Sequence, residues 1–299
     1  MKINRIITLL LVAILFSVMD ARPLQQFLHE GWSFRQARGT NWYPATVPGV
    51  VHTDLLNNGL IEDPFYRLNE RGVQWVDKED WMYRTTFDVS PELLSKENII
   101  LRFDGLDTYA DVTLNGKKIL SADNMFREWQ ADVRSLLKLK DNQLEVYLHS
   151  PIKIAMPKWE AVPFQYRSSN DQSENGGLFD RKVGVFVRKA GYHFGWDWGP
   201  RLVTSGIWRP VTLEAWNDAR INDVFYNQKA VTEREASIDV VVELLADKEV
   251  TAELKVVNRT DHRTENRKSV HLTKGLNKVP VSFTMKKPKL WWTNGLGEP

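Results

Sequence analysis

The chain of 299 residues contains no cysteine. Disulfide bonds, thiolate metal ligands and a cysteine nucleophile are therefore excluded. Because it needs no disulfide, the chain can fold outside the cytoplasm without help from an oxidising system.

The sequence also has almost no excess of charge of one sign. Lys plus Arg total 40 against 38 for Asp plus Glu, so the formal net charge is only +2. A nucleic-acid-binding protein usually carries a concentrated basic face, and we expect no nucleic-acid partner. The six histidines show no paired metal-ligand spacing, and the sequence has neither a phosphate-binding loop nor a dinucleotide fingerprint. We therefore expect neither a metal nor a cofactor.

Long apolar runs are confined to the first residues. Lys2 and Arg5 precede the almost wholly apolar stretch 6–18, and a small residue follows at Ala21. This pattern predicts a signal peptide over residues 1–21, because the apolar run is shorter than the ~20 residues of a spanning helix. An uncleaved membrane anchor is the alternative. We expect a periplasmic or secreted protein that has no membrane contact after signal cleavage.

Alternating strand patterns dominate the sequence after residue 22. Residues 81–87 alternate aromatic and polar side chains, and 143–148 place three apolar side chains on one face. Asn115 followed by Gly116 is the strongest short hairpin signal. Further strands are expected at 99–103, 110–114, 117–119 and 211–216. Short strands separated by turns predict an all-β protein that begins with an antiparallel sandwich.

Helical signals are few. One short helix is expected at 53–58, ending near Gly59. Another is expected at 91–96, with Ser90 as its N-cap and Pro91 at its first position.

The strand pattern restarts after a boundary at Asn217 and Asp218. Strands are expected at 237–244, 250–257 and 279–284, and a polar, charged loop is expected over 259–268. Three or four strands over 218–299 predict part of an immunoglobulin-like sandwich, because a complete one has about seven strands. We expect this second domain to be truncated.

Tryptophan is abundant, with 12 residues, and two of them flank an aspartate in the run from Gly195 to Pro200. An indole face suits the C–H face of a pyranose ring, and a carboxylate can accept hydrogen bonds from two neighbouring hydroxyls. Trp196, Asp197 and Trp198 are therefore candidate substrate-binding residues. The alternative is a rigid turn in which Asp197 caps backbone amides.

This run and its flanks, 187–194 and 201–211, resemble the sugar-binding domain of β-mannosidases in glycoside hydrolase family 2. Other segments are similar to that family in the same order: 45–50, 63–64, 81–87 and the hairpin 101–116. Trp291–Trp292 with 295–299 looks like a closing strand of the family's second domain. The resemblance covers nearly the whole chain after residue 24. The Trp-Asp-Trp run distinguishes the mannosidases from family members such as β-galactosidases and β-glucuronidases.

The resemblance implies a jelly-roll-like first domain over 22–217 and an immunoglobulin-like second domain over 218–299. It also implies that the first domain sends Trp196, Asp197 and Trp198 into the pocket of a later (β/α)8 barrel, where Asp197 would hold sugar hydroxyls. Two glutamates of the barrel would perform the retaining chemistry, so that no catalytic residue is expected in this chain. The Asn69–Glu70 pair lies in the opening region and is expected to be a surface loop.

Three further residues are candidates for supporting roles. His193 would touch the substrate or serve the fold, and Arg188 or Arg181 would pair with Asp197 or lie on a solvated strand edge. The implied activity is removal of terminal β-D-mannose from a mannose-containing oligosaccharide. A stand-alone carbohydrate-binding module without catalysis is the alternative, and an unfinished second domain favours the enzyme.

Overall fold

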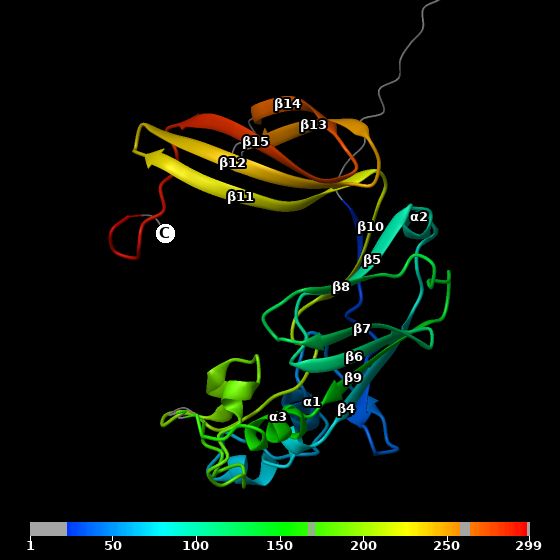
Figure 1. The fold of residues 1–299 in the computed structure, drawn as a ribbon, viewed down its shortest axis with the longest axis vertical. Helices are drawn as coiled ribbons and strands as arrows, with labels where there is room; N and C mark the ends of the chain where they lie inside the picture. Colours follow the sequence, from blue (N-terminus) through cyan, green and yellow to red (C-terminus); the bar gives the residue numbers. More distant parts are fainter. Residues whose placement is uncertain (1–22, 167, 169–170, 258–263, 298–299) are drawn as a thin grey trace, which may run out of the picture. The chain divides into compact units, whose positions relative to one another are not determined.

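The computed structural model describes residues 23–299 except 167, 169–170, 258–263 and 298–299. The expected signal peptide over residues 1–21 lies outside the described residues. Contacts divide the described chain into two compact units, Pro23–Asn217 and Asp218–Pro299. Antiparallel strands build both units (Figure 1), and the prediction of an all-β protein is confirmed.

The first unit contains two antiparallel sheets. The larger sheet has the strand order β3 (Tyr43–Pro44), β2 (Ser33–Gln36), β4 (Trp81–Phe87), β9 (Asn142–His149), β6 (Tyr109–Leu114) and β7 (Lys117–Asp123). The smaller sheet has the order β1 (Leu24–Phe27), β10 (Val211–Trp216), β5 (Asn98–Phe103) and β8 (Trp129–Asp132). Most neighbouring strands are not consecutive in the chain, which is the connectivity of a jelly-roll-like sandwich.

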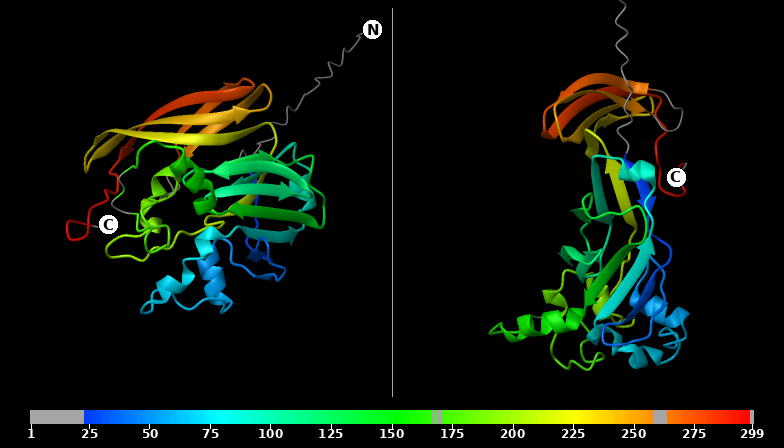
Figure 2. Two further views of the ribbon diagram at one scale, coloured as in Figure 1. Left: turned by 60° about the horizontal axis from the view of Figure 1, so that its bottom comes forward. Right: turned by 90° about the vertical axis from the view of Figure 1, so that its right-hand side faces the viewer.

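Alternating side chains give the two sheets a common core. Tyr83 of β4 and Val146 of β9 are fully buried, and they belong to the same hydrophobic cluster as Leu101 of β5 and Leu213 of β10. Because successive side chains of a strand point to opposite faces, the period of two in the sequence becomes one buried face on each sheet. Figure 2 shows this unit from two further sides.

Local signals are confirmed at two connections. The hairpin between β6 and β7 turns at Asn115 and Gly116, whose φ angles of 51° and 80° are those that Asn-Gly turns require. Helix α2 (Pro91–Leu94) begins as expected, because the Ser90 Oγ accepts a hydrogen bond from the Leu93 amide at 3.2 Å.

Two long connections lie side by side at one end of the sandwich (Figure 1). The first joins β3 to β4 and contains α1 (Val51–Asn57), η1 (Asn69–Val73) and η2 (Val76–Lys78). The second joins β9 to β10 and contains α3 (Pro151–Glu160), η3 (Gly184–Phe186) and η4 (Gly191–Phe194). A small core of its own holds the second connection together, formed by Tyr109, Ile152, Ala155, Leu178, Val183, Val187, Phe194 and Val203.

The second unit contains a three-stranded and a two-stranded sheet. The first has the order β11 (Ala219–Val231), β12 (Glu235–Ala246) and β15 (Gly275–Lys286), and the second pairs β13 (Val250–Val257) with β14 (Thr264–Leu272). Both sheets contribute to one core, formed by Val240, Val242, Leu244, Ala246, Val270, Leu272, Val279 and Val281. The pairing of β11 with β12 shifts register after Ile221 and again after Gln228.

Two expectations for this unit are wrong. Of the polar loop predicted over 259–268, residues 264–268 belong to strand β14, which pairs with β13, and residues 259–263 lie outside the described residues. The pattern misled because Arg267 and Lys268 are both exposed, so this part of the strand has no apolar alternation. Trp291 and Trp292 form no closing strand, and they are 72% and 44% exposed. The reason is that a strand needs a paired neighbour, and none of the described strands pairs with these residues.

Candidate functional site

The Trp-Asp-Trp run forms a closed two-residue turn. The Trp196 amide donates to the Gly199 carbonyl at 3.2 Å, and the Gly199 amide donates to the Trp196 carbonyl at 3.4 Å. Asp197 and Trp198 therefore occupy the two central positions of the turn. We call Trp196–Gly199 the recognition turn.

Gly195 sets the direction in which the chain enters the recognition turn. Its φ of 96° and ψ of 164° lie in a region that only glycine adopts readily. Gln172 packs against it and is hydrogen-bonded on both sides, because its amide donates to the Phe194 carbonyl at 2.8 Å and its Nε2 donates to the Trp196 carbonyl at 2.6 Å. The side chain of any other residue at position 195 would collide with Gln172.

The side chains of the recognition turn face outward. Trp198 is 78% exposed, Asp197 is exposed and Trp196 is half-buried. The two indole rings lie 4.6 Å apart between centroids, with 55° between their planes. Among the described residues, no hydrogen-bond or ion-pair partner engages the Asp197 carboxylate, so the expected alternative, in which Asp197 caps backbone amides, is not what the structure has.

Arg201 anchors the chain where it leaves the recognition turn. Its side chain is 1% exposed, pairs with the Asp77 carboxylate at 2.7 Å and donates to the Gln74 Oε1 at 2.8 Å. Gln74 returns a hydrogen bond from its Nε2 to the Arg201 carbonyl at 2.7 Å. The turn is therefore held at its exit by the connection between β3 and β4.

The arginines proposed to orient Asp197 lie elsewhere. Arg188 forms an ion pair with Asp123 at 2.5 Å, at the end of β7. Within the described part of the chain, neither Arg188 nor Arg181 pairs with Asp197.

His193 has mainly structural surroundings. Its Nδ1 lies 3.1 Å from the Thr204 Oγ1, and its ring stacks on Tyr192 with centroids 4.5 Å apart. Burial and, second, the ammonium of Lys189 lower the pKa of His193 to about 4, so the imidazole is neutral at neutral pH.

A buried polar cluster next to His193 is absent from the sequence-based expectations. Lys189 forms an ion pair with Asp107, and both side chains are almost completely buried. Burial lowers the pKa of Lys189, and burial together with the Lys189 charge lowers the pKa of His52 to about 4. Because lysine and aspartate are rarely buried, their residue types did not predict a buried ion pair. The available signal was the position of Asp107 between the apolar Leu106 and the strand β6.

The Asn69–Glu70 pair, expected to be a surface loop, lies in a short 3-10 helix and is half-buried. Asn69 and Glu70 belong to η1, where the Glu70 carbonyl accepts a hydrogen bond from the Gln74 Nε2 at 2.8 Å. Among the described residues, no group of three or more His, Asp or Glu side chains is arranged to hold a metal ion. None of the helices in this part of the chain is both long enough and apolar enough to cross a membrane.

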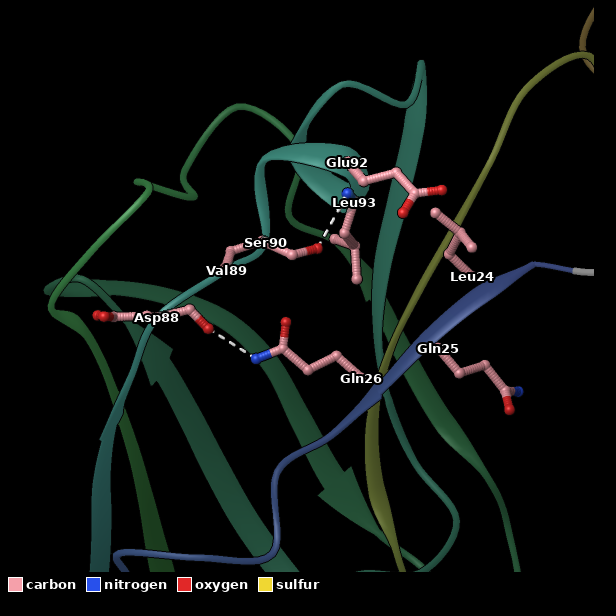
Figure 3. Close-up of a pocket in the computed structure, with 8 residues that line it drawn as sticks. All are labelled: Leu24, Gln25, Gln26, Asp88, Val89, Ser90, Glu92 and Leu93. Atoms are coloured by element: carbon pink, nitrogen blue, oxygen red, sulfur yellow. Dashed lines mark hydrogen bonds between the residues drawn. The ribbon is translucent and has the colours of Figure 1, made fainter.

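A cavity of about 480 Å³ lies between β1 and the segment that leads into α2 (Figure 3). Its lining residues are Leu24, Gln25, Gln26, Asp88, Val89, Ser90, Glu92 and Leu93. The Gln26 side chain crosses part of the cavity, and its Nε2 donates a hydrogen bond to the Asp88 carbonyl at 2.6 Å. Because no residue of the recognition turn lines this cavity, the candidate site is an exposed surface feature and not this pocket.

Two family models match the chain. The model described as "Glycosyl hydrolase 2 galactose-binding domain-like" matches residues 32–209, and the model described as "Glycosyl hydrolases family 2" matches residues 219–299.

Two curated relatives are both named β-mannosidase B. The chain is 35% identical over 284 residues to β-mannosidase B of Aspergillus terreus and 36% identical over 290 residues to β-mannosidase B of Neosartorya fischeri. Both alignments cover 92% of this chain but 32% of the relative. The chain therefore spans about a third of the length of these relatives.

The chain also covers only about a third of the solved structures that it matches. The β-D-mannosidase from Dictyoglomus thermophilum matches with a TM-score of 0.80 and 38% identity, over 92% of this chain and 33% of that one. An exo-chitosanase from Amycolatopsis orientalis matches with a TM-score of 0.66 and 20% identity, over 91% of this chain and 30% of that one, and at this identity it shows the fold alone. The matches to both units and to these relatives show that the chain belongs to glycosyl hydrolase family 2, with the family's galactose-binding-like domain in its first unit.

Proposed function

We propose that this chain is the sugar-recognition part of a β-mannosidase-type glycoside hydrolase, and that Trp196, Asp197 and Trp198 bind the terminal β-D-mannose of an oligosaccharide. The observation that carries the proposal is the carboxylate of Asp197, which is exposed between two indoles and has no partner among the described residues, on a turn anchored at both ends. A carboxylate that served only the fold would be engaged by backbone amides or by a cation.

The chemistry of the turn suits a neutral sugar. The tilted indole faces offer apolar contact to the C–H groups of a pyranose ring. The Asp197 carboxylate can accept hydrogen bonds from two neighbouring hydroxyls, and each hydrogen bond to a charged group contributes about 1.5–3 kcal/mol. The nearby His193 is neutral, so it would not attract an anionic sugar such as a uronic acid.

Bond cleavage belongs, in this proposal, to a part of the enzyme beyond these 299 residues. A retaining mechanism needs two carboxyl groups about 5 Å apart on either side of the glycosidic bond. The relatives named β-mannosidase are about three times as long as the aligned region, which favours an enzyme part over a stand-alone carbohydrate-binding module. We also propose that residues 1–21 direct export, which would place the enzyme in the periplasm or outside the cell.

Binding of methyl β-D-mannopyranoside to the 299-residue chain tests the recognition step. Saturation-transfer NMR should show contact with the mannoside, and weaker contact with the matching galactoside. Trp198→Ala should abolish the transfer. Trp291→Ala is the matched control, because Trp291 is similarly exposed (72% against 78%) but lies in the other unit. Equal transfer to the wild type and Trp198→Ala would disprove the assigned role of the turn.

A hydrolysis assay tests whether these 299 residues are a complete catalyst. The purified 299-residue chain is expected not to release the aryl group from an aryl β-mannoside. Turnover that survives repurification of the chain would show that the catalytic groups lie within it.

A further inference from the structure

Four polar side chains from three segments of the chain are in contact with one another, and two of these segments lie next to the recognition turn in the sequence. Lys189 pairs with the Asp107 carboxylate and donates a second hydrogen bond to the Thr204 Oγ1 at 2.9 Å. Thr204 donates its own proton to the Asp107 Oδ2 at 2.7 Å, and its oxygen lies 3.1 Å from the His193 Nδ1. We call Lys189, Asp107, Thr204 and His193 the Lys189 cluster.

The hydrogen bonds of the cluster have a direction. Because the Thr204 proton points to Asp107, the Thr204 oxygen acts as an acceptor toward the other two groups. The Nδ1 of the neutral His193 must then be the protonated nitrogen. Thr204 therefore links the Lys189 ammonium to the imidazole of His193.

The cluster ties together the two arms of the chain that carry the recognition turn. One arm, 189–193, leads into the turn, and the other, 204–206, follows it. Asp107 joins the second arm by two backbone hydrogen bonds with Gly206, each 2.9 Å long. Its carboxylate joins both arms, because the same Oδ2 accepts hydrogen bonds from Lys189 and Thr204.

Stability alone does not account for this arrangement. Burying a lysine and an aspartate has a large desolvation cost, and apolar side chains of similar volume often stabilise a fold equally well. What apolar side chains cannot supply is direction, because hydrogen bonds fix the mutual orientation of the groups they join. The buried pair therefore suits a part of the chain whose geometry matters.

We propose that Lys189 is a positioning residue for the recognition turn. Its ammonium holds Asp107 and Thr204, so that the two arms keep a fixed position relative to each other. That position in turn fixes the orientation of Trp196 and Trp198. The proposal rests on the proposed function only for the purpose of the turn, because Lys189 itself is completely buried and does not reach a sugar.

The test observes the turn directly in the ligand-free 299-residue chain. The 12 tryptophans are labelled with 5-fluorotryptophan, and the ¹⁹F resonances of interest are assigned with single Trp→Phe variants. Thr204→Val removes the hydroxyl that links Lys189 to His193, and Thr204→Ser retains it. We expect Thr204→Val to shift or broaden the resonances of Trp196 and Trp198. The resonances of the core residues Trp32 and Trp81 should keep their positions, and Thr204→Ser should restore the wild-type spectrum.

A second pair of variants addresses the charge. Lys189→Met should change the same two turn resonances. Lys153→Met removes an ion pair between Lys153 of α3 and Asp80, and it should change neither resonance. If Lys189→Met does not fold, the comparison of the Thr204 variants decides.

The proposal is overturned if the turn resonances are unchanged in folded Thr204→Val, if Thr204→Ser behaves like Thr204→Val, or if all resonances move together. Since no sugar is present, the result is independent of whether the chain binds a mannoside.

Discussion

A methyl group added at Gly195 should displace the recognition turn. The backbone there has φ 96° and ψ 164°, which an alanine adopts only under strain. The new Cβ would lie 2.7 Å from the Gln172 Oε1 and 3.0 Å from the Gln172 Cβ. Gln172 cannot retreat freely, because its Nε2 holds the Trp196 carbonyl at 2.6 Å.

The magnitude follows from these two effects. A residue forced into such a backbone region costs of order 1–3 kcal/mol. Loss of the Gln172 hydrogen bond adds about 1 kcal/mol, so Gly195→Ala should destabilise the first unit by about 2–4 kcal/mol. For a unit of this size each kcal/mol lowers Tm by roughly 2–4 °C, which gives a fall of roughly 4–16 °C.

Thermal and urea unfolding of Gly195→Ala beside Gly191→Ala provides the assay. A Cβ on Gly191 would meet no atom within 4 Å, so that variant should stay within about 0.5 kcal/mol of the wild type. The effect of alanine on the unfolded chain is the same in both variants and cancels in the comparison. Equal midpoints for the two variants would refute the idea that backbone strain and Gln172 fix the turn.

Three further outcomes are expected. In the longer enzyme that we propose, Asp197→Ala should lower kcat/KM for an aryl β-mannoside by roughly one to two decades, since a hydrogen bond to a charged group contributes about 1.5–3 kcal/mol; an unchanged value would leave Asp197 without a role in recognition. Burial lowers the pKa of His52 from 6.5 to about 4, so below pH 6.5 the unfolded chain takes up a proton that the folded chain refuses. The stability linked to neutral His52 is therefore complete above pH 6.5, and about 3 kcal/mol of it is lost as the pH falls to 4. The urea midpoint should fall less steeply with falling pH in His52→Gln than in the wild type. Mass spectrometry of the exported protein should place its first residue near position 22, and a product that retains Met1 would contradict signal cleavage.

Strands and turns were predictable where their causes are local. The segments expected at 81–87, 211–216 and 250–257 coincide with β4, β10 and β13, because alternation along a strand depends only on neighbours in the sequence. The turn at Asn115 and Gly116 was predictable for the same reason, since their backbone preferences are intrinsic.

Helix α3 was not expected from the sequence, although it has a local start signal. Ser150 and Pro151 repeat the start signal of α2, and the Ser150 Oγ accepts a hydrogen bond from the Lys153 amide at 3.1 Å. Pro157 lies inside the helix and reads as a helix breaker in the sequence. Packing of α3 on the small core of the second connection overrides that preference.

The site was only partly predictable, because its supports are distant in the sequence. Residue types alone made Trp196, Asp197 and Trp198 candidates, but they do not separate exposed from buried indoles, since Trp198 is 78% exposed and Trp81 is 2% exposed. Lys189 and Asp107 lie 82 positions apart, and nothing in either local sequence announces the other. Such pairs become visible only when the fold brings the segments together.

Strand β11 forms an edge of its three-stranded sheet, with Phe225 and Tyr226 62% and 64% exposed. A long, flat, apolar edge is a template on which another polypeptide can add a strand, and it is a common origin of aggregation. The register shifts after Ile221 and Gln228 bend and twist this edge. Irregularities that interrupt the ladder within the sheet thus shorten the straight edge on which a foreign strand could pair.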